Sequence, residues 1–326
     1  MSRVRQLGHG TDTGKKRRRN EDDYVVEPPL FAIADGMGGA QAGELASSLA
    51  AGALRDDEAR AGSGERRVSE LIQEANRRVY QRSSEDAAAS GMGTTMTVAL
   101  VGDGAVAFGH VGDSRAYLIR DGKLEQLTED HSLVAELVRS GKLSPEEAET
   151  HPQRSVITRA LGTDPDVDVD TFSIETMPSD LFMLCSDGLT SMVEDDVILD
   201  TVEKHRDDLQ AAAKALIRAA NKGGGEDNIT VVFFEIGDET REPLEETAQY
   251  PALGADGDGE LDDDTLDELD RVPALDTTVV APGEAEEAAE PSKPKGRTRS
   301  RVVPALLMIL IALAVVAVVL WTLHGR

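Results

Sequence analysis

The stretch FAIADGMGG at residues 31–39 is an apolar run that ends on an acidic residue, Asp35, and it is the first of four such signatures. Three comparable stretches follow it: VAFGHVGDSRAYL at 106–118, LFMLCSDGL at 181–189 and GGGEDNITVVFF at 223–234. They place Asp113, Asp187 and Asp227 beside runs of β-forming residues. Four unrelated, solvated turns are the alternative. Carboxylates that converge at strand ends repel one another unless a cation neutralises them, so the pattern predicts a site for a hard metal ion.

The composition is typical of a globular enzyme with appended segments. The chain has 326 residues and a formal net charge of −27, which excludes non-specific nucleic-acid binding because the phosphates would be repelled. The single cysteine, Cys185, lies in an apolar run and predicts a buried thiol in a reducing compartment. We expect no secretory signal, because the first residues lack an apolar segment.

The chain divides into a folded domain at residues 1–237 and a series of appended segments. Residues 238–301 are acidic, poor in apolar residues and basic at their end, which predicts a disordered linker. Residues 302–323, VVPALLMILIALAVVAVVLWTL, carry no charge and have the length of a membrane-spanning helix, followed by a short tail at 324–326. A buried core helix is the alternative for this segment.

The charges around residues 302–323 predict the orientation of that helix. Basic residues crowd its N-terminal flank: Lys293, Lys295, Arg297, Arg299 and Arg301. The other flank has only Arg326 and a mostly neutral His324. Since positive charge near a span stays inside, we expect a single-pass protein of the cell membrane with a cytoplasmic folded domain.

Short β-branched runs and amphipathic runs predict an α+β fold with antiparallel sheets. The predicted strands are residues 31–34, 94–101, 105–111, 116–120, 181–185 and 229–236. The predicted helices are residues 44–54, 68–79, 131–139 and 207–220. Gly102-Asp103-Gly104 and Asp121-Gly122 have the composition of hairpin turns.

Further stretches occur with the four acidic ones: TDTGKKRRRNEDD at 11–23, GMGTTMT at 91–97, LTEDHSLVAELVRSG at 127–141 and HPQRSVITRALG at 151–162. In this order the set resembles the metal-dependent protein phosphatases of the PP2C (PPM) type, particularly bacterial serine/threonine phosphatases partnered with membrane receptor kinases. The resemblance covers residues 8–236. It implies a β-sandwich flanked by helices, a two-metal centre that uses Mn²⁺ or Mg²⁺, and phosphoserine or phosphothreonine substrates.

The resemblance also assigns roles to the acidic residues. Asp35 should bridge two metal ions, and the carbonyl of Gly36 should be a further ligand. Asp187 and Asp227 should complete the ligands of the first ion, and Asp113 matches the residue that holds a third, looser ion. Two such ions can acidify a shared water and align it with phosphorus. An all-oxygen ligand set suits Mg²⁺ or Mn²⁺ rather than zinc.

The basic loop before the first acidic residues carries the expected phosphate contact. Glu21 and Asp22 match family residues that bind metal through water, and Arg17 matches the phosphate-binding arginine. A guanidinium can hold two phosphate oxygens at once. The alternative is a diffuse basic loop formed together with its neighbours: Lys15, Lys16, Arg18 and Arg19.

Some positions depart from the family pattern. Met37 and Ala40 stand where some members have a histidine that can act as general acid, so the proton donor for the leaving group stays unassigned. The scattered histidines are expected to be structural: His9, His110, His131 and His151. A further acidic stretch, GADGDGELDDDT at 254–265, lacks the first and twelfth ligands of a calcium loop and favours a solvated linker.

Residues 137–162 match the flap of the family, a variable region beside the active site in which Ser144, Pro145 and Glu147 form a predicted helix start. The sequence thus predicts a phosphoprotein phosphatase that opposes a bacterial serine/threonine kinase. A phosphatase of small phosphoesters and a catalytically inactive module that binds phosphoproteins at the membrane are the alternatives.

Overall fold

The computed structural model describes residues 4–38, 42–56, 63–237 and 278–279. The chain forms two units, 1–286 and 287–326, and the second lies entirely outside the described residues. Outside them also lie Ala40, the predicted membrane span and nearly all of the predicted linker. Within the described ranges, no helix is both long enough and apolar enough to cross a bilayer.

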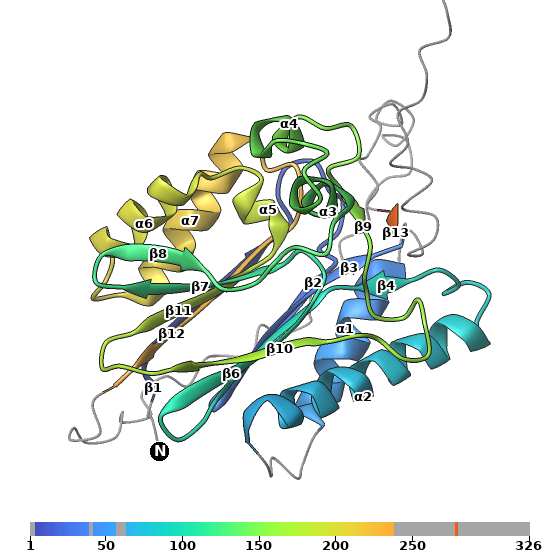
Figure 1. The fold of residues 1–326 in the computed structure, drawn as a ribbon, viewed down its shortest axis with the longest axis horizontal. Coiled ribbons are helices and arrows are strands. Elements are labelled where there is room, and N and C mark those ends of the chain that lie inside the picture. The colour runs from blue at the N-terminus through green and yellow to red at the C-terminus, as the bar shows by residue number, and fades with distance from the viewer. Residues whose placement is uncertain (1–3, 39–41, 57–62, 238–277, 280–326) are drawn as a thin grey trace, which may run out of the picture. The chain divides into compact units, whose positions relative to one another are not determined.

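Two antiparallel sheets form the centre of the domain (Figure 1). One sheet has the order β1 (Val4–Asp12), β12 (Ile229–Ile236), β11 (Leu181–Cys185), β7 (Arg115–Arg120) and β8 (Lys123–Gln126). The other has the order β10 (Asp170–Glu175), β6 (Ala105–Val111), β5 (Met96–Val101), β3 (Leu30–Met37) and β2 (Asp22–Glu27), and β4 (Gly93–Thr94) pairs with β3.

Aromatic side chains fill the space between the two sheets. Phe31 of one sheet stacks on Phe234 of the other at a centroid distance of 4.3 Å, and Phe182 stacks on Phe234 at 5.1 Å. All three are fully buried. Because these strands are apolar on both faces, their sequence is continuously hydrophobic, which made them the easiest strands to predict.

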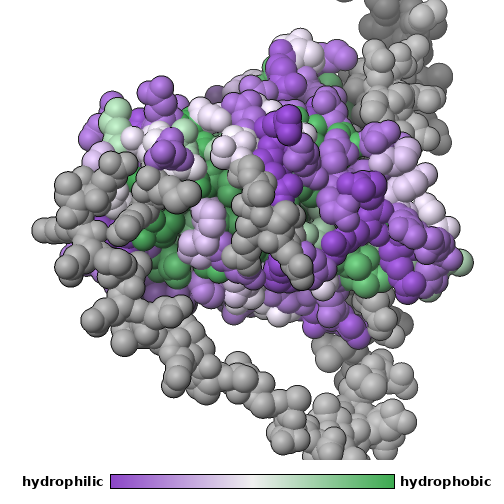
Figure 2. Space-filling view, turned by 90° about the horizontal axis from the view of Figure 1, so that it is seen from below, coloured by the Kyte–Doolittle hydropathy of each residue, from purple (hydrophilic) through white to green (hydrophobic). Residues whose placement is uncertain are grey.

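Helices cover the outer face of each sheet (Figure 1). On one side lie α1 (Ala42–Arg55) and α2 (Gly64–Glu85), and on the other α5 (Asp187–Thr190), α6 (Asp195–Lys204) and α7 (Leu209–Gly223). The predicted α+β sandwich of antiparallel sheets flanked by helices is therefore confirmed. The face seen in Figure 2 is mostly hydrophilic with smaller hydrophobic areas. In the described residues, the well-exposed large apolar side chains are Met177 and Val197.

The flap region contains two short helices and a short strand. These are α3 (Leu133–Arg139), α4 (Pro145–Glu149) and β9 (Val156–Ile157). At the start of α4, the Ser144 hydroxyl accepts from the Glu147 amide and the Glu147 carboxylate accepts from the Ser144 amide, as the sequence predicted. Two residues of the predicted linker form β13 (Thr278–Val279), which pairs in parallel with β9.

Most predicted elements agree with the structure, and the differences have local causes. The predicted strand 94–101 is interrupted at Thr95, whose amide and hydroxyl both bond to the backbone of Asp35. Both predicted hairpin turns occur: Gly102 N–H donates to the Ala105 carbonyl, and Asp121 and Gly122 have φ of 53° and 70°. The missed elements are β1, β2, β8, β9, β10, β13, α5 and α6. The missed strands lie at sheet edges or have only two residues, and α5 has only four, so their sequences carry little apolar periodicity.

Candidate metal centre

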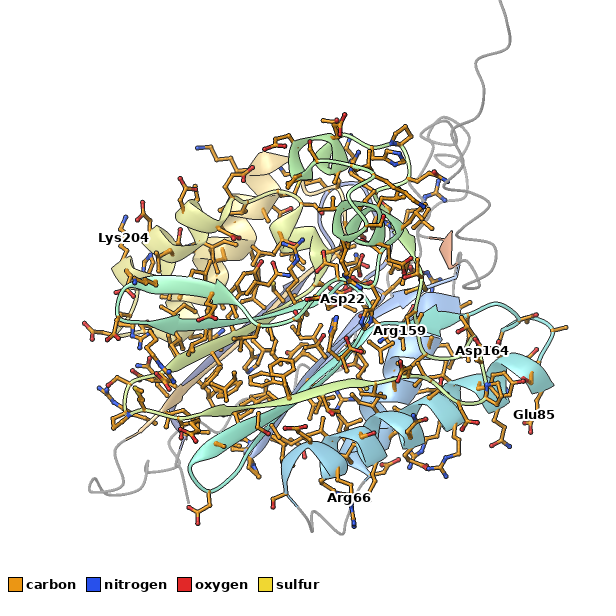
Figure 3. All side chains as sticks on the ribbon, viewed as in Figure 1. Asp22, Arg66, Glu85, Arg159, Asp164 and Lys204 are labelled. Atoms are coloured by element: carbon orange, nitrogen blue, oxygen red, sulfur yellow. The ribbon has the colours of Figure 1, made fainter. Side chains whose placement is uncertain are left out.

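The acidic residues predicted from the sequence meet at one end of the sandwich. Asp22 opens β2 and lies directly opposite Asp35 of β3 in the antiparallel register. Asp113 lies in the loop between β6 and β7, Asp187 begins α5, and Asp227 precedes β12. Figure 3 marks Asp22 among the side chains inside the molecule. Like charges that face each other across strands are destabilising, so this arrangement serves something other than stability.

The carboxylates lie close enough to repel one another, and this repulsion raises their pKa values. Burial raises the pKa of Asp35 well above its usual value, and repulsion from its four acidic neighbours raises it further. The pKa of Asp187 is also raised by burial and then by the same cluster, while Arg17 opposes the shift. A pair of carboxylates that raise each other's pKa in this way needs a compensating cation to ionise fully.

Asp22 is the most completely anchored member of the cluster. Its Oδ2 accepts hydrogen bonds from Thr230 Oγ1 at 2.6 Å and from Ser186 Oγ at 2.9 Å. Burial raises the pKa of Asp22 to about 6, although these two hydrogen bonds lower it. Its other oxygen, Oδ1, is buried and accepts no hydrogen bond in the described structure. The same is true of Asp187 Oδ1. Buried, unpartnered oxygens are costly unless a ligand satisfies them.

Asp113 lies at the edge of the cluster and is only 8% exposed. Burial raises its pKa to about 7, Asp130 raises it further, and Arg115 opposes the shift. Gly112, which precedes it, has φ of 116°, and a Cβ there would lie 2.5 Å from Thr95. The backbone therefore needs glycine at this position to bring Asp113 to the site.

Arg17 lies beside the carboxylate cluster. Its Nη2 donates to Asp227 Oδ2 at 2.8 Å, across a sequence separation of 210 residues. Burial lowers the pKa of Arg17, but attraction to Asp227, Asp35 and Glu21 outweighs burial, so the pKa lies above the usual value. The guanidinium thus faces the carboxylate cluster, whereas Arg19 pairs with Glu44 at 3.3 Å. Arg17 and Arg19 therefore have different partners, and of these two only Arg17 pairs with a member of the carboxylate cluster.

Glu21 and Gly36 lie against the start of α1. The Gly36 amide donates to the Glu21 carbonyl at 3.1 Å. A Cβ at Gly36 would lie 2.1 Å from the Gly43 carbonyl oxygen, so only glycine fits between the two segments. The Glu21 carboxyl group in turn lies beside Gly43. The predicted roles of Glu21 and Gly36 toward metal remain predictions.

Sequence reasoning missed the polar residues that hold these carboxylates in place. Asn228 accepts from the Glu21 amide at 2.8 Å and donates to the carbonyls of Thr13 and Arg19. It therefore fixes the basic loop to the start of β12. The Asn of the EDN motif was the available signal, because a buried amide can bind several backbone groups at once. Ser186 and Thr230, which anchor Asp22, carry no comparable local signal.

These residues fit a metal centre of hard, hydrated ions. In the part of the chain that the structure describes, no three acidic, histidine or cysteine side chains close around one point as a complete cage. Mg²⁺ and similar ions keep several waters and need few protein oxygens each, so a water-rich pair of ions does not require such a cage. The all-oxygen donor set and the unpartnered oxygens of Asp22 and Asp187 agree with that arrangement.

The histidines contact the scaffold. His110 Nδ1 is 2.9 Å from the Thr97 hydroxyl, and burial lowers the pKa of His110 to about 3. His131 Nδ1 accepts from the Gly112 amide, so its Nε2 carries the proton and donates to Asp170 at 3.0 Å. Cys185 is fully buried, as predicted, and burial raises the pKa of its thiol to about 12. Its thiol is therefore unsuited to act as a nucleophile.

Comparisons with known proteins find relatives over the folded domain. Residues 10–238 match the family described as protein phosphatase 2C. The chain is 41% identical over 236 residues to the serine/threonine phosphatase stp of Listeria monocytogenes serotype 4b, covering 69% of this chain and 93% of that one. It is 40% identical over 230 residues to PstP of Mycobacterium tuberculosis, covering 70% of this chain and 44% of that one.

Solved structures show the same fold. The crystal structure of the Mycobacterium tuberculosis phosphatase PstP/Ppp has a TM-score of 0.68 and 38% identity, covering 72% of this chain and all of that one. The catalytic domain of PstP in complex with two manganese ions has a TM-score of 0.67 and 36% identity, covering 72% of this chain and 99% of that one.

Proposed function

The chain belongs to the protein phosphatase 2C family, and from this membership we propose how its own residues serve the reaction. The protein is a metal-dependent phosphatase that hydrolyses phosphoserine and phosphothreonine in proteins. The observation that carries the assignment is the cluster of mutually repelling carboxylates, with unpartnered oxygens on Asp22 and Asp187, beside the guanidinium of Arg17.

The cofactors are Mn²⁺ or Mg²⁺. When bound, such ions neutralise the carboxylates, polarise the phosphoryl oxygens and acidify the attacking water. We propose that Asp35, Asp187 and Asp227 hold a pair of ions, with the Gly36 carbonyl as a further ligand. Asp113 would hold a third. Asp22 and Glu21 would act through water, since the hydroxyls of Ser186 and Thr230 already occupy one oxygen of Asp22.

Arg17 is the proposed phosphate-binding residue. The guanidinium bonds to Asp227 and is attracted by Asp35 and Glu21, so it can exchange a carboxylate partner for phosphoryl oxygens of the substrate. A bidentate contact of this kind both orients the phosphoryl group and offsets its negative charge. The cluster would otherwise repel a phosphate dianion.

Hydrolysis assays separate this function from its alternatives. Phosphothreonine peptides and an aryl phosphate should be hydrolysed in Mn²⁺ and not in excess EDTA. A catalytically inactive binding module would hydrolyse neither substrate, and a phosphatase of small phosphoesters would hydrolyse only the aryl phosphate. Activity that persists in excess chelator would contradict the metal mechanism.

We propose further that residues 302–323 anchor the protein in the cell membrane and that the catalytic domain faces the cytoplasm, where it opposes a serine/threonine kinase. The support is the uncharged segment itself and the basic residues that precede it in the sequence. Protease added to intact spheroplasts should leave the phosphatase domain undigested. Digestion from outside would contradict the orientation, and recovery of the full-length protein in the soluble fraction would contradict the anchor.

A further inference from the structure

A cavity of about 840 Å³ opens beside the metal centre. Asp113 and Asp187 line it together with the flap helices α3 and α4 and the segment that joins α5 to α6. Asp187, one of whose oxygens is buried without a hydrogen-bond partner, is one of the lining residues. A volume of this size can take several residues of a peptide, which is more than a phosphoryl group needs. The cavity is therefore large enough for residues that flank the phosphorylated side chain of a substrate.

The arginines that line the cavity are already compensated. Arg115 pairs with Asp130 at 2.8 Å through two nitrogens. The remaining two also have carboxylate partners: Arg139 with Glu129 at 3.0 Å and Arg154 with Glu226 at 4.0 Å. These partnerships leave little positive charge available to attract an acidic substrate segment.

Two carboxylates of the lining lack such compensation. Among the described residues, neither Glu194 nor Asp195 has a cation within ion-pair distance, and both are exposed. Glu194 is the N-cap residue of α6 but makes no side-chain capping bond, so its carboxylate does not serve the helix in that way. Asp195 lies in the first turn of α6, where a carboxylate is mildly stabilising, but Asp196 lies there too and does not line the cavity.

We propose that this cavity is a substrate subsite that selects phosphoprotein segments with lysine or arginine near the phosphorylated residue, and that Glu194 and Asp195 provide the selection. The proposal rests on the phosphatase function above. A basic side chain of the substrate would face two uncompensated carboxylates, whereas an acidic one would face them unfavourably. The apolar residues of the wall, Val134, Val138 and Val193, would contact the aliphatic part of that side chain.

A peptide comparison tests the subsite. Two phosphothreonine peptides of equal length, one with arginines and one with glutamates on either side of the phosphothreonine, are hydrolysed in Mn²⁺ at low ionic strength. An aryl phosphate, which has no flanking residues, serves as the reference for the chemistry. We expect kcat/KM to favour the basic peptide by about fivefold, since each exposed charge pair contributes modestly. The preference should shrink as salt screens the charges.

Matched variants then locate the source of the preference. The double variant Glu194→Gln, Asp195→Asn should bring the ratio of kcat/KM between the basic and the acidic peptide close to one. The double variant Glu194→Lys, Asp195→Lys should reverse the preference. Asp196→Asn with Asp200→Asn removes the same number of charges from the same helix but outside the cavity lining, so it should keep the wild-type ratio. Thermal unfolding checks that each variant is folded.

The outcomes distinguish the subsite from the proposed function. Equal kcat/KM for the two peptides, or a ratio that the control variant changes as much as the cavity variant, would overturn the subsite and leave the phosphatase assignment standing. Failure to hydrolyse any substrate in Mn²⁺ would overturn both.

Discussion

An aspartate lies near each end of strand β11, and the two aspartates differ in how their charge is compensated. Asp180 directly precedes the strand and Asp187 follows it closely. Asp180 is 1% exposed and accepts from Arg120 Nε at 2.7 Å, from Arg120 Nη2 at 2.5 Å and from the Met177 amide at 2.7 Å. Both oxygens of its carboxylate therefore accept a hydrogen bond, which is typical of a buried charge that stabilises a fold.

Asp187 has the opposite environment. One of its oxygens is buried without a hydrogen-bond partner, and its neighbours include Asp113, Asp227 and Asp22. Burial and repulsion both raise its pKa. The comparison shows that the same residue type at two ends of one strand can hold the scaffold together or carry strain that a ligand must relieve.

Asp187→Asn should produce the largest loss of activity. Removing one charge from the metal site is expected to lower kcat by at least about 10²-fold in Mn²⁺. Steady-state hydrolysis of a phosphopeptide measures the effect, and isothermal titration with Mn²⁺ should show weakened binding. Asp227→Asn should behave in the same way. Turnover close to wild type in either variant would contradict the ligand assignment.

Arg17→Ala should mainly raise KM for phosphorylated substrate. Loss of a bidentate phosphate contact costs about 1.5–3 kcal/mol, which corresponds to roughly a 10- to 150-fold loss of kcat/KM. Arg19→Ala is the matched control, because Arg19 pairs with Glu44 at the surface. Arg18→Ala provides a second comparison. Equal, small effects in all three variants would indicate a diffuse basic loop.

Asp180→Asn should destabilise the fold while the folded enzyme keeps its kcat. Breaking a buried, bidentate ion pair leaves Arg120 without its counter-charge, and because that arginine is 27% exposed we expect a loss of about 2 kcal/mol. Urea denaturation in EDTA measures the change in the free energy of unfolding. Asp187→Asn should cause no comparable loss under the same conditions. If Asp187→Asn lowered the free energy of unfolding more than Asp180→Asn does, the comparison between the two aspartates would be contradicted.

Without metal, the protein should become less stable as the pH rises. The pKa of Asp22 is about 6 and that of Asp113 about 7, both above the usual value near 3.9 for an unfolded chain. The folded protein therefore holds protons that the unfolded chain has released, so the free energy of unfolding falls from about pH 4 upward and levels off above about pH 7. In EDTA, we expect Tm to be lower by roughly 5 °C at pH 8 than at pH 5. Saturating Mn²⁺ should remove this fall, and a Tm in EDTA that is constant or rises would contradict the prediction.

The sequence predicted the central strands better than the edges. Residues 31–34, 181–185 and 229–236 were recognised because strands buried on both faces are continuously apolar. The edge strand β10 was missed because its exposed face interrupts the apolar pattern with polar residues. The helix start at Ser144 was predicted because capping depends on residues that are close in sequence.

The acidic signatures, the class of metal chemistry and the residues of the α4 cap could be read from the chain alone, because each depends on residue type and short spacing. The packing of distant segments was needed to learn that Asp22 faces Asp35, that Arg17 reaches Asp227 across 210 residues, and that Asp180 is compensated while Asp187 is not. The physical reason is that burial and charge compensation depend on which distant segments pack together, and local sequence patterns carry no record of those neighbours.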